Sequence, residues 1–221
     1  RLPRWLDTEY KHFEGVNGKE LSYDCESCNK MVSYHNVRKT SQHLGKTGCF
    51  LSHMKLLKHI VDYKLNKVIV VEDDALQVNQ LPESLPDTFT YLGGFIMNKK
   101  ITSKEKIEIN HTNGINTLDT KYRMLTTLAY YIPKWEIAEE IFQRLLKLKR
   151  WRAIDIVYGN IIENPKYVYP AVYIEEPSQS QIQNNKNKFA DLSIRILDKL
   201  AAQEDEQKSR EADYTKAMGL V

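Results

Sequence analysis

Two apolar runs of different spacing lie at the centre of this chain. Apolar side chains first recur at the spacing of one helix face, which predicts a helix from residue 47 to about residue 63, with Thr47 as its N-cap. A continuous β-branched run, Val68 to Val71, follows and predicts a strand that is buried on both faces. The core face of the helix consists of Phe50, Met54, Leu57, Ile60 and Val61. The sequence thus predicts a helix that leads into a buried strand.

The flanking segments predict short strands and a second amphipathic helix. Strands are expected at residues 10–13, 126–132 and 167–173, the last at a sheet edge because it contains Pro170. Pro133 is expected to start a helix, since proline is tolerated in the first turn. The buried stripe of that helix consists of Ile137, Ile141, Leu145 and Leu148. Residues 22–44 are polar and are predicted to form a loop with a short helix.

Three carboxylates, Glu72, Asp73 and Asp74, follow the predicted central strand without a gap. Neighbouring carboxylates repel one another and raise each other's pKa unless a cation compensates them. Hard oxygen ligands favour Mn²⁺ or Mg²⁺ over zinc. Ligands of open α/β sheets bind beyond the carboxyl ends of strands, where this triplet falls. The triplet therefore predicts a metal site, with a solvated acidic turn as the alternative.

Composition excludes several classes of protein. A content of 42% hydrophobic and 28% charged residues favours neither a disordered chain nor a membrane protein. The net charge of +3 is too small to indicate a nucleic-acid surface. We expect no transmembrane segment, because no apolar run is long enough to span a bilayer, and no signal peptide is visible. These features predict a cytoplasmic protein.

The number and spacing of the cysteines do not predict a structural zinc site. Cys25 and Cys28 form a C-x-x-C pair, but no second pair follows it. We expect them to lie in a loop, either as free thiols or locally oxidised.

The central segment resembles glycosyltransferase family 25. Members of that family carry a Gly-Cys-x-x-Ser-His motif ahead of an apolar strand that ends in Glu-Asp-Asp. Here the motif is residues 48–53, reading Gly-Cys-Phe-Leu-Ser-His, and the strand ends at residues 72–74. Weaker similarity extends over about residues 10 to 183, including residues 89–94, 126–132 and 153–156.

The resemblance implies an α/β fold of the GT-A (Rossmann-like) nucleotide-sugar transferase kind, a mixed central sheet flanked by helices. It assigns residues 1–188 to this domain and leaves 189–221 as a charged helical appendage, a linker, or a connection to a further domain or partner. The implied function is metal-dependent transfer of a hexose, galactose or glucose, from a UDP-sugar to a saccharide or glycoprotein acceptor. Inversion at the anomeric carbon is expected, in lipopolysaccharide or other glycan biosynthesis.

The resemblance also implies roles for individual residues. Mn²⁺ or Mg²⁺ would be held by Glu72, Asp73 and Asp74, the triplet described above. The UDP-sugar would be bound by Ser52, His53, Asp73, Gly93 and Gly94, with the glycines allowing backbone to approach the ligand. Asp155 is the expected general base. Alternatives remain for two of these residues: His53 lies on the predicted core face of its helix, and Asp155 is placed to cap the next helix.

Some features depart from the family pattern. The family's Asn-Leu-x-x-x-x-Arg passage, which supplies the first nucleotide-contacting strand, has no counterpart, so the donor site is built differently or the chain is truncated. Leu128 stands where members often have His, and Ala153 replaces a proline. Two other functions therefore stay open: a non-catalytic sugar-binding or scaffold module, and a metal-dependent phosphoryl-transfer enzyme with the same carboxylates.

Overall fold

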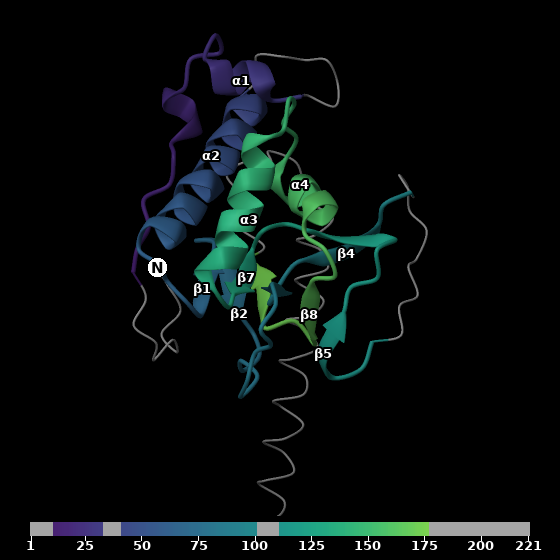
Figure 1. Cartoon of the computed structure of the whole chain (residues 1–221). Helices are drawn as coiled ribbons and strands as arrows, with labels where there is room; N and C mark the ends of the chain where they lie inside the picture. Colours follow the sequence, from purple (N-terminus) through teal and green to yellow (C-terminus); the bar gives the residue numbers. More distant parts are fainter. Residues whose placement is uncertain (1–10, 33–40, 101–110, 177–221) are drawn as a thin grey trace, which may run out of the picture. The chain divides into compact units, whose positions relative to one another are not determined.

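The computed structural model of the chain describes residues 11–32, 41–100 and 111–176 (Figure 1). The chain divides into two compact units, Arg1–Ile174 and Glu175–Val221, and the fold described below is that of the first. The expected domain boundary at residue 188 and the appendage over 189–221 lie outside the described residues.

A mixed sheet forms the centre of the first unit. Its five strands lie in the order β1-β7-β3-β8-β5. The β3–β8 pair is parallel, and the β1–β7, β3–β7 and β5–β8 pairs are antiparallel. The strands are β1 (Val68–Val71), β3 (Thr90–Tyr91), β5 (Gly114–Thr117), β7 (Ala129–Ile132) and β8 (Lys166–Tyr169). Two further ribbons pair β2 (Ala75–Gln77) with β9 (Tyr173–Glu175), and β4 (Phe95–Asn98) with β6 (Tyr122–Leu125).

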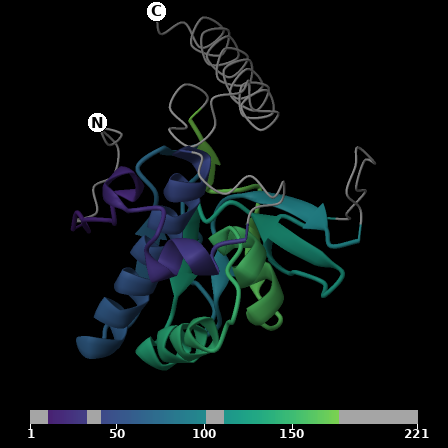
Figure 2. The ribbon, with the colours of Figure 1, turned by 90° about the horizontal axis from the view of Figure 1, so that it is seen from above.

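Helices pack against this sheet, as the α/β prediction requires. Helices α2 and α3 lie side by side in both views of the ribbon (Figures 1 and 2). The helices are η1 (Gly18–Glu20), α1 (Glu26–Lys30), α2 (Ser41–Asp62), α3 (Trp135–Leu146) and α4 (Ile154–Ile161). The predicted mixed sheet flanked by helices is confirmed.

Strand β7 shows how the core is divided. All four of its residues are buried, because β7 lies between β1 and β3. Tyr130 and Ile132 belong to the larger hydrophobic cluster, with side chains of α2 and α3, whereas Ala129 and Tyr131 belong to a smaller one. Successive side chains of a strand point to opposite faces, so each face of the sheet has its own core.

Strand β1 has the predicted residues but not the predicted burial. It lies at the edge of the five-stranded sheet, and Ile69 is 37% exposed. Val68 and Val70 pack on the larger cluster, on the helix side. The prediction of burial on both faces is wrong, because a short aliphatic run does not distinguish an edge strand from a central one.

Helix α2 begins at Ser41, not at Thr47. Thr47 is fully buried, and its hydroxyl donates to the His43 carbonyl one turn earlier at 2.9 Å. A threonine inside a helix often makes this bond in place of a cap. The N-cap prediction is therefore wrong, while the predicted core face is confirmed by Phe50, Leu57 and Ile60, which are fully buried.

Other sequence predictions need smaller corrections. Lys11–Phe13, the described part of the first predicted strand, has no regular structure. Helix α3 begins at Trp135, after Pro133. Strand β8 lies between β3 and β5 and ends before Pro170, so it is not an edge strand. Cys25 and Cys28 are free thiols as expected, but they begin helix α1, where the Cys25 sulfur accepts from the Cys28 N–H at 3.1 Å.

Candidate active site

The carboxylate of Glu72 lies at the centre of a polar cluster beyond the end of β1. Its Oε1 atom accepts a hydrogen bond from the Thr127 hydroxyl and lies 3.2 Å from Nε2 of His53. Burial acts to raise the pKa of Glu72, but the contacts with His53 and Thr127 outweigh it and bring the pKa below its usual value. Glu72 is therefore ionised at neutral pH.

His53 connects this carboxylate to the core. Its Nδ1 atom lies 2.8 Å from the Tyr130 hydroxyl on β7. Since a carboxylate only accepts, Nε2 of His53 carries the hydrogen that is donated to Glu72, and in the neutral ring Nδ1 accepts from Tyr130. Both ring nitrogens are thus engaged, and His53 is 5% exposed. The core location weighed from the sequence is confirmed for this residue.

Cys49 occupies the same cluster, one helical turn before His53. The Cys49 sulfur, a His53 ring nitrogen and a Glu72 oxygen all lie within 4.8 Å of one another. Burial raises the pKa of the Cys49 thiol, and the carboxylates of Glu72, Asp155 and Asp74 raise it further. The thiol is therefore neutral, and the three carboxylates that act on it were all singled out from the sequence.

Asp155 lies in the first turn of α4 and is held by backbone groups. Its carboxylate accepts from the N–H groups of Thr126, at 3.1 Å, and Ile156, at 2.7 Å. Burial raises the pKa of Asp155; those two bonds act to lower it, the charge of Glu72 raises it, and Lys46 lowers it, with a net shift upward. Asp155 is not the cap of α4, since the N-cap position is Ala153, although it bonds the Ile156 N–H within the first turn. The raised pKa, the other alternative from the sequence, agrees with the burial of this carboxyl.

Thr126 lies between β6 and β7 in a conformation that is rare for its residue type. Its φ is +67°, in the left-handed region that β-branched residues avoid. The backbone there directs the Thr126 N–H to Asp155, while the next side chain, Thr127, reaches Glu72. The turn that contains Thr126 and Thr127 thus holds the carboxylates of both Asp155 and Glu72. A positive φ at a residue such as Thr126 is a form of backbone strain that is common near functional sites.

Asp73 and Asp74 form the tip of the turn between β1 and β2. The turn is closed by the Ala75 N–H, which donates to the Glu72 carbonyl at 3.1 Å. Asp73 is exposed and Asp74 is half-buried. The predicted triplet is therefore split: Glu72 is held by His53 and Thr127, whereas the other two carboxylates lie at the turn.

Ser52 and Gly48 hold the N-terminal segment against α2. The Ser52 hydroxyl accepts from the Val16 N–H at 2.7 Å and donates to the Gly48 carbonyl at 2.8 Å. A Cβ on Gly48 would lie 2.7 Å from the Gly18 nitrogen, so only glycine allows this approach. The contacts of Ser52 are thus with protein backbone.

Gly93 and Gly94 also face protein backbone. A Cβ on Gly93 would lie 2.6 Å from the Tyr173 carbonyl oxygen, and one on Gly94 would lie 2.6 Å from that of Leu125. Gly94 also has a φ of +117°. These close approaches account for both glycines without a bound ligand.

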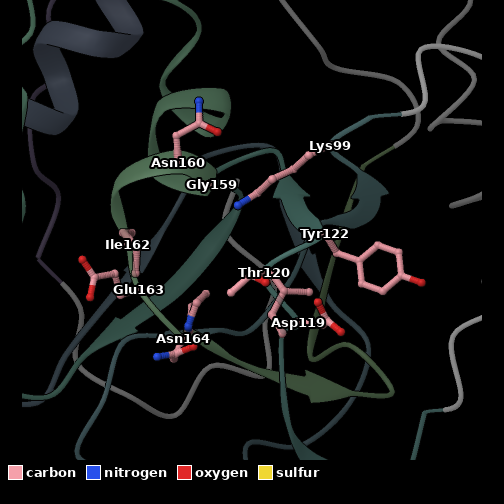
Figure 3. Close-up of a pocket in the computed structure, with 11 residues that line it drawn as sticks. Lys99, Asp119, Thr120, Tyr122, Gly159, Asn160, Ile162, Glu163 and Asn164 are labelled. Atoms are coloured by element: carbon pink, nitrogen blue, oxygen red, sulfur yellow. The ribbon is translucent and has the colours of Figure 1, made fainter.

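A separate polar pocket lies at the opposite ends of β6 and α4 from Thr126 and Asp155. Its volume is about 290 Å³. Figure 3 shows the Lys99 side chain extended toward Gly159 of α4. The polar side chains of the lining are Lys99, Asp119, Thr120, Tyr122, Asn160, Glu163 and Asn164. Hydroxyl, amide, carboxylate and ammonium groups beside one aromatic ring suit a ligand with many hydroxyls.

Sequence reasoning missed several residues of the cluster. Cys49 had a signal, since it falls four residues before His53 in the motif and therefore on the same helix face. Thr127 and Tyr130 had none, because His53 and Tyr130 are 77 positions apart. Lys46, whose charge lowers the pKa of Asp155, lies one turn before Cys49 on α2.

The described residues contain no helix that is long and apolar enough to cross a membrane. The sequence profile of glycosyltransferase family 25 (LPS biosynthesis protein) matches residues 4–158. That stretch includes α2, the turn after β1, Thr127 and Asp155.

Two proteins that are similar to part of this chain are named as glycosyltransferases. Over 83 residues, 36% of this chain, the sequence is 34% identical to human procollagen galactosyltransferase 2. It is 33% identical over 76 residues, 31% of this chain, to a glycosyltransferase 25 family member of Drosophila pseudoobscura pseudoobscura. The matched segments amount to only 13% and 12% of those proteins. No solved structure matches the chain significantly.

Proposed function

Because the chain belongs to glycosyltransferase family 25, we propose that it transfers a hexose, galactose first, from a UDP-sugar to a hydroxyl of a saccharide or glycoprotein. The observation that carries this proposal is that adjacent residues of one turn hold two carboxylates: the Thr126 N–H donates to Asp155 and the Thr127 hydroxyl donates to Glu72. An inverting transferase needs carboxylates for two tasks, at the leaving diphosphate and at the acceptor hydroxyl.

Asp74 and Asp73 are our candidates for binding Mn²⁺ or Mg²⁺. Both are carboxylates at a solvent-accessible turn, which fits a hard ion that also contacts phosphate oxygens and water. Such an ion supplies charge that stabilises the diphosphate as it leaves. Glu72 has a different part in this proposal: its Oε1 atom holds His53 and Thr127, and so fixes the start of the turn.

Asp155 is our candidate for the general base. A base accepts the hydroxyl proton of the acceptor best when its pKa lies near the working pH, and burial raises the pKa of this carboxyl. The Thr126 and Ile156 N–H groups hold its two oxygens in place. Lys46 is a candidate to attract the donor diphosphate, since its charge acts on the same carboxyl.

The pocket around Lys99 is our candidate for the acceptor. It lies one strand length along β6 from Thr126, so it is separate from the proposed base but on the same strand. Its volume of about 290 Å³ is sufficient for a sugar ring with its hydration water. The acceptor would extend from this pocket toward Asp155.

Incubation of the 221-residue chain with a panel of UDP-sugars and Mn²⁺ tests the proposed function. Release of UDP supports the transferase. Binding without release supports a non-catalytic sugar-binding module. A parallel incubation with nucleic acid and Mn²⁺ tests the third class. Cleavage there, with no release of UDP from the UDP-sugars, supports the phosphoryl-transfer enzyme.

A further inference from the structure

We propose that Cys49, His53 and Glu72 form a second metal site, one that binds a thiophilic divalent cation of the Zn²⁺ class. This site differs from the Mn²⁺ or Mg²⁺ site proposed at Asp73 and Asp74, because it uses a sulfur and an imidazole nitrogen. It does not depend on the transferase function.

The donors are already close together. The three donor atoms lie within 4.8 Å of one another, and Nε2 of His53 is 3.2 Å from Oε1 of Glu72. In tetrahedral zinc sites, bonds of about 2.0 to 2.3 Å place donors roughly 3.3 to 3.8 Å apart. A small movement of the Cys49 and Glu72 side chains would bring the three donor atoms to the separations found in a zinc site.

The backbone supports each donor independently. Cys49 and His53 are four residues apart on α2, so they lie on one face of a continuous helix. Glu72 comes from the end of β1 and is held by Thr127. Tyr130 fixes the His53 ring through Nδ1, while Nε2 faces Glu72. A metal-bound histidine commonly has its other nitrogen held in this way.

The surrounding charge favours a cation. The carboxylates of Glu72, Asp155 and Asp74 all act on the Cys49 sulfur. Binding would convert the Cys49 thiol to a thiolate, with its proton released to the buffer. The hydrogen on Nε2 of His53 would move to Nδ1, which would then donate to the Tyr130 hydroxyl, and two bonds to the metal would replace the His53–Glu72 hydrogen bond. A set of thiolate, imidazole and carboxylate selects Zn²⁺ over Mg²⁺ and Mn²⁺. Water would take the fourth position.

Titration of the full chain with Co²⁺, followed by absorbance, tests this site. Co²⁺ replaces Zn²⁺ and gives a sulfur-to-metal charge-transfer band when a thiolate binds it. We expect a saturable band at one equivalent, which Zn²⁺ abolishes and excess Mg²⁺ does not. Absence of the band in the wild-type chain would overturn the proposal. The experiment uses no sugar and no turnover, so its result is separate from that of the proposed function.

Cysteine variants show which thiol binds the metal. Cys49→Ser is expected to lose the band, whereas Cys25→Ser is expected to keep it, because serine preserves the N-cap of α1. The reverse pattern would assign the metal to the C-x-x-C pair and refute the site. If Cys49→Ser does not fold, Glu72→Gln serves instead: the band should remain, and Zn²⁺ affinity should fall at least about tenfold. Unchanged affinity in Glu72→Gln contradicts the proposal.

Discussion

Nε2 of His53 lies 3.2 Å from Oε1 of Glu72, which joins helix α2 to the end of strand β1. The contact continues through Nδ1 of His53 to Tyr130, and so into the core. His53 of the Gly-Cys-x-x-Ser-His motif and Glu72 of the Glu-Asp-Asp triplet are thereby held in one polar network.

Acid should weaken the fold through Glu72. Its pKa is lower in the folded chain than the ordinary 4.5, so the unfolded chain binds more protons in that range. The stability that Glu72 contributes is complete above pH 4.5 and is lost as the pH falls through the folded-state pKa. Glu72→Gln should cost about 1 to 3 kcal/mol at neutral pH. Urea unfolding at several pH values measures this, and a cost that stays constant into acid would contradict it.

Gly48→Ala should destabilise the fold by about 1 to 3 kcal/mol, because the new Cβ would lie 2.7 Å from the Gly18 nitrogen. Thermal or urea unfolding measures the loss. Lys58→Ala is the matched control: it lies on the same helix, and its exposed ion pair with Asp62 contributes about 0.5 kcal/mol or less. Equal stability of the Gly48→Ala chain and the wild type would show that α2 does not pack closely on this segment.

Asp155→Asn should lower the rate of transfer by about 10² to 10⁴ while UDP-sugar binding is retained. In the wild type the rate should rise with pH through the pKa of Asp155, which lies above the ordinary 3.8, because the base acts in its ionised form. Glu26→Gln, at an exposed carboxylate on α1, is the control and should have wild-type rates. An unchanged rate in Asp155→Asn would exclude Asp155 as the base.

Lys99→Met should raise the acceptor KM about tenfold, the effect of losing one hydrogen bond of roughly 1.4 kcal/mol. Hydrolysis of the UDP-sugar in the absence of acceptor should not change, because Lys99 lies in the pocket beyond the far end of β6. A steady-state comparison of the two reactions makes the distinction. If the variant impaired donor hydrolysis and left the acceptor KM unchanged, the pocket would not be the acceptor site.

The sequence predicted those parts of the fold that depend on neighbouring residues. The run Val68 to Val71 gave a strand, and the stripe through Ile141 and Leu145 gave a helix, since each pattern is local. The start of α2 was missed because a buried Thr47 bonded to His43 resembles an N-cap in sequence. The exposure of Ile69 was missed because it depends on the position of β1 in the sheet.

The candidate site was predictable only in part, for the same reason. Glu72, Asp74 and Asp155 were singled out by residue type and by resemblance, and the charges of all three raise the pKa of the Cys49 thiol, after its burial. The contacts of Thr127 and Tyr130 join distant parts of the chain, so no local sequence pattern predicts them. Gly93 was singled out as a position of close approach, and in the structure it approaches the backbone of Tyr173. A sequence shows that space is needed and not what fills it.

The central claim is that carboxylates after β1 bind a divalent cation and, with it, a uridine nucleotide. Calorimetric titration of UDP into the full chain tests this most directly, with Mn²⁺ present, with Mn²⁺ removed, and with Asp74→Asn. We predict heat of binding in the presence of Mn²⁺, at least about tenfold weaker binding without it, and the same loss in Asp74→Asn. No heat in the presence of Mn²⁺, or binding that neither change affects, would contradict the account.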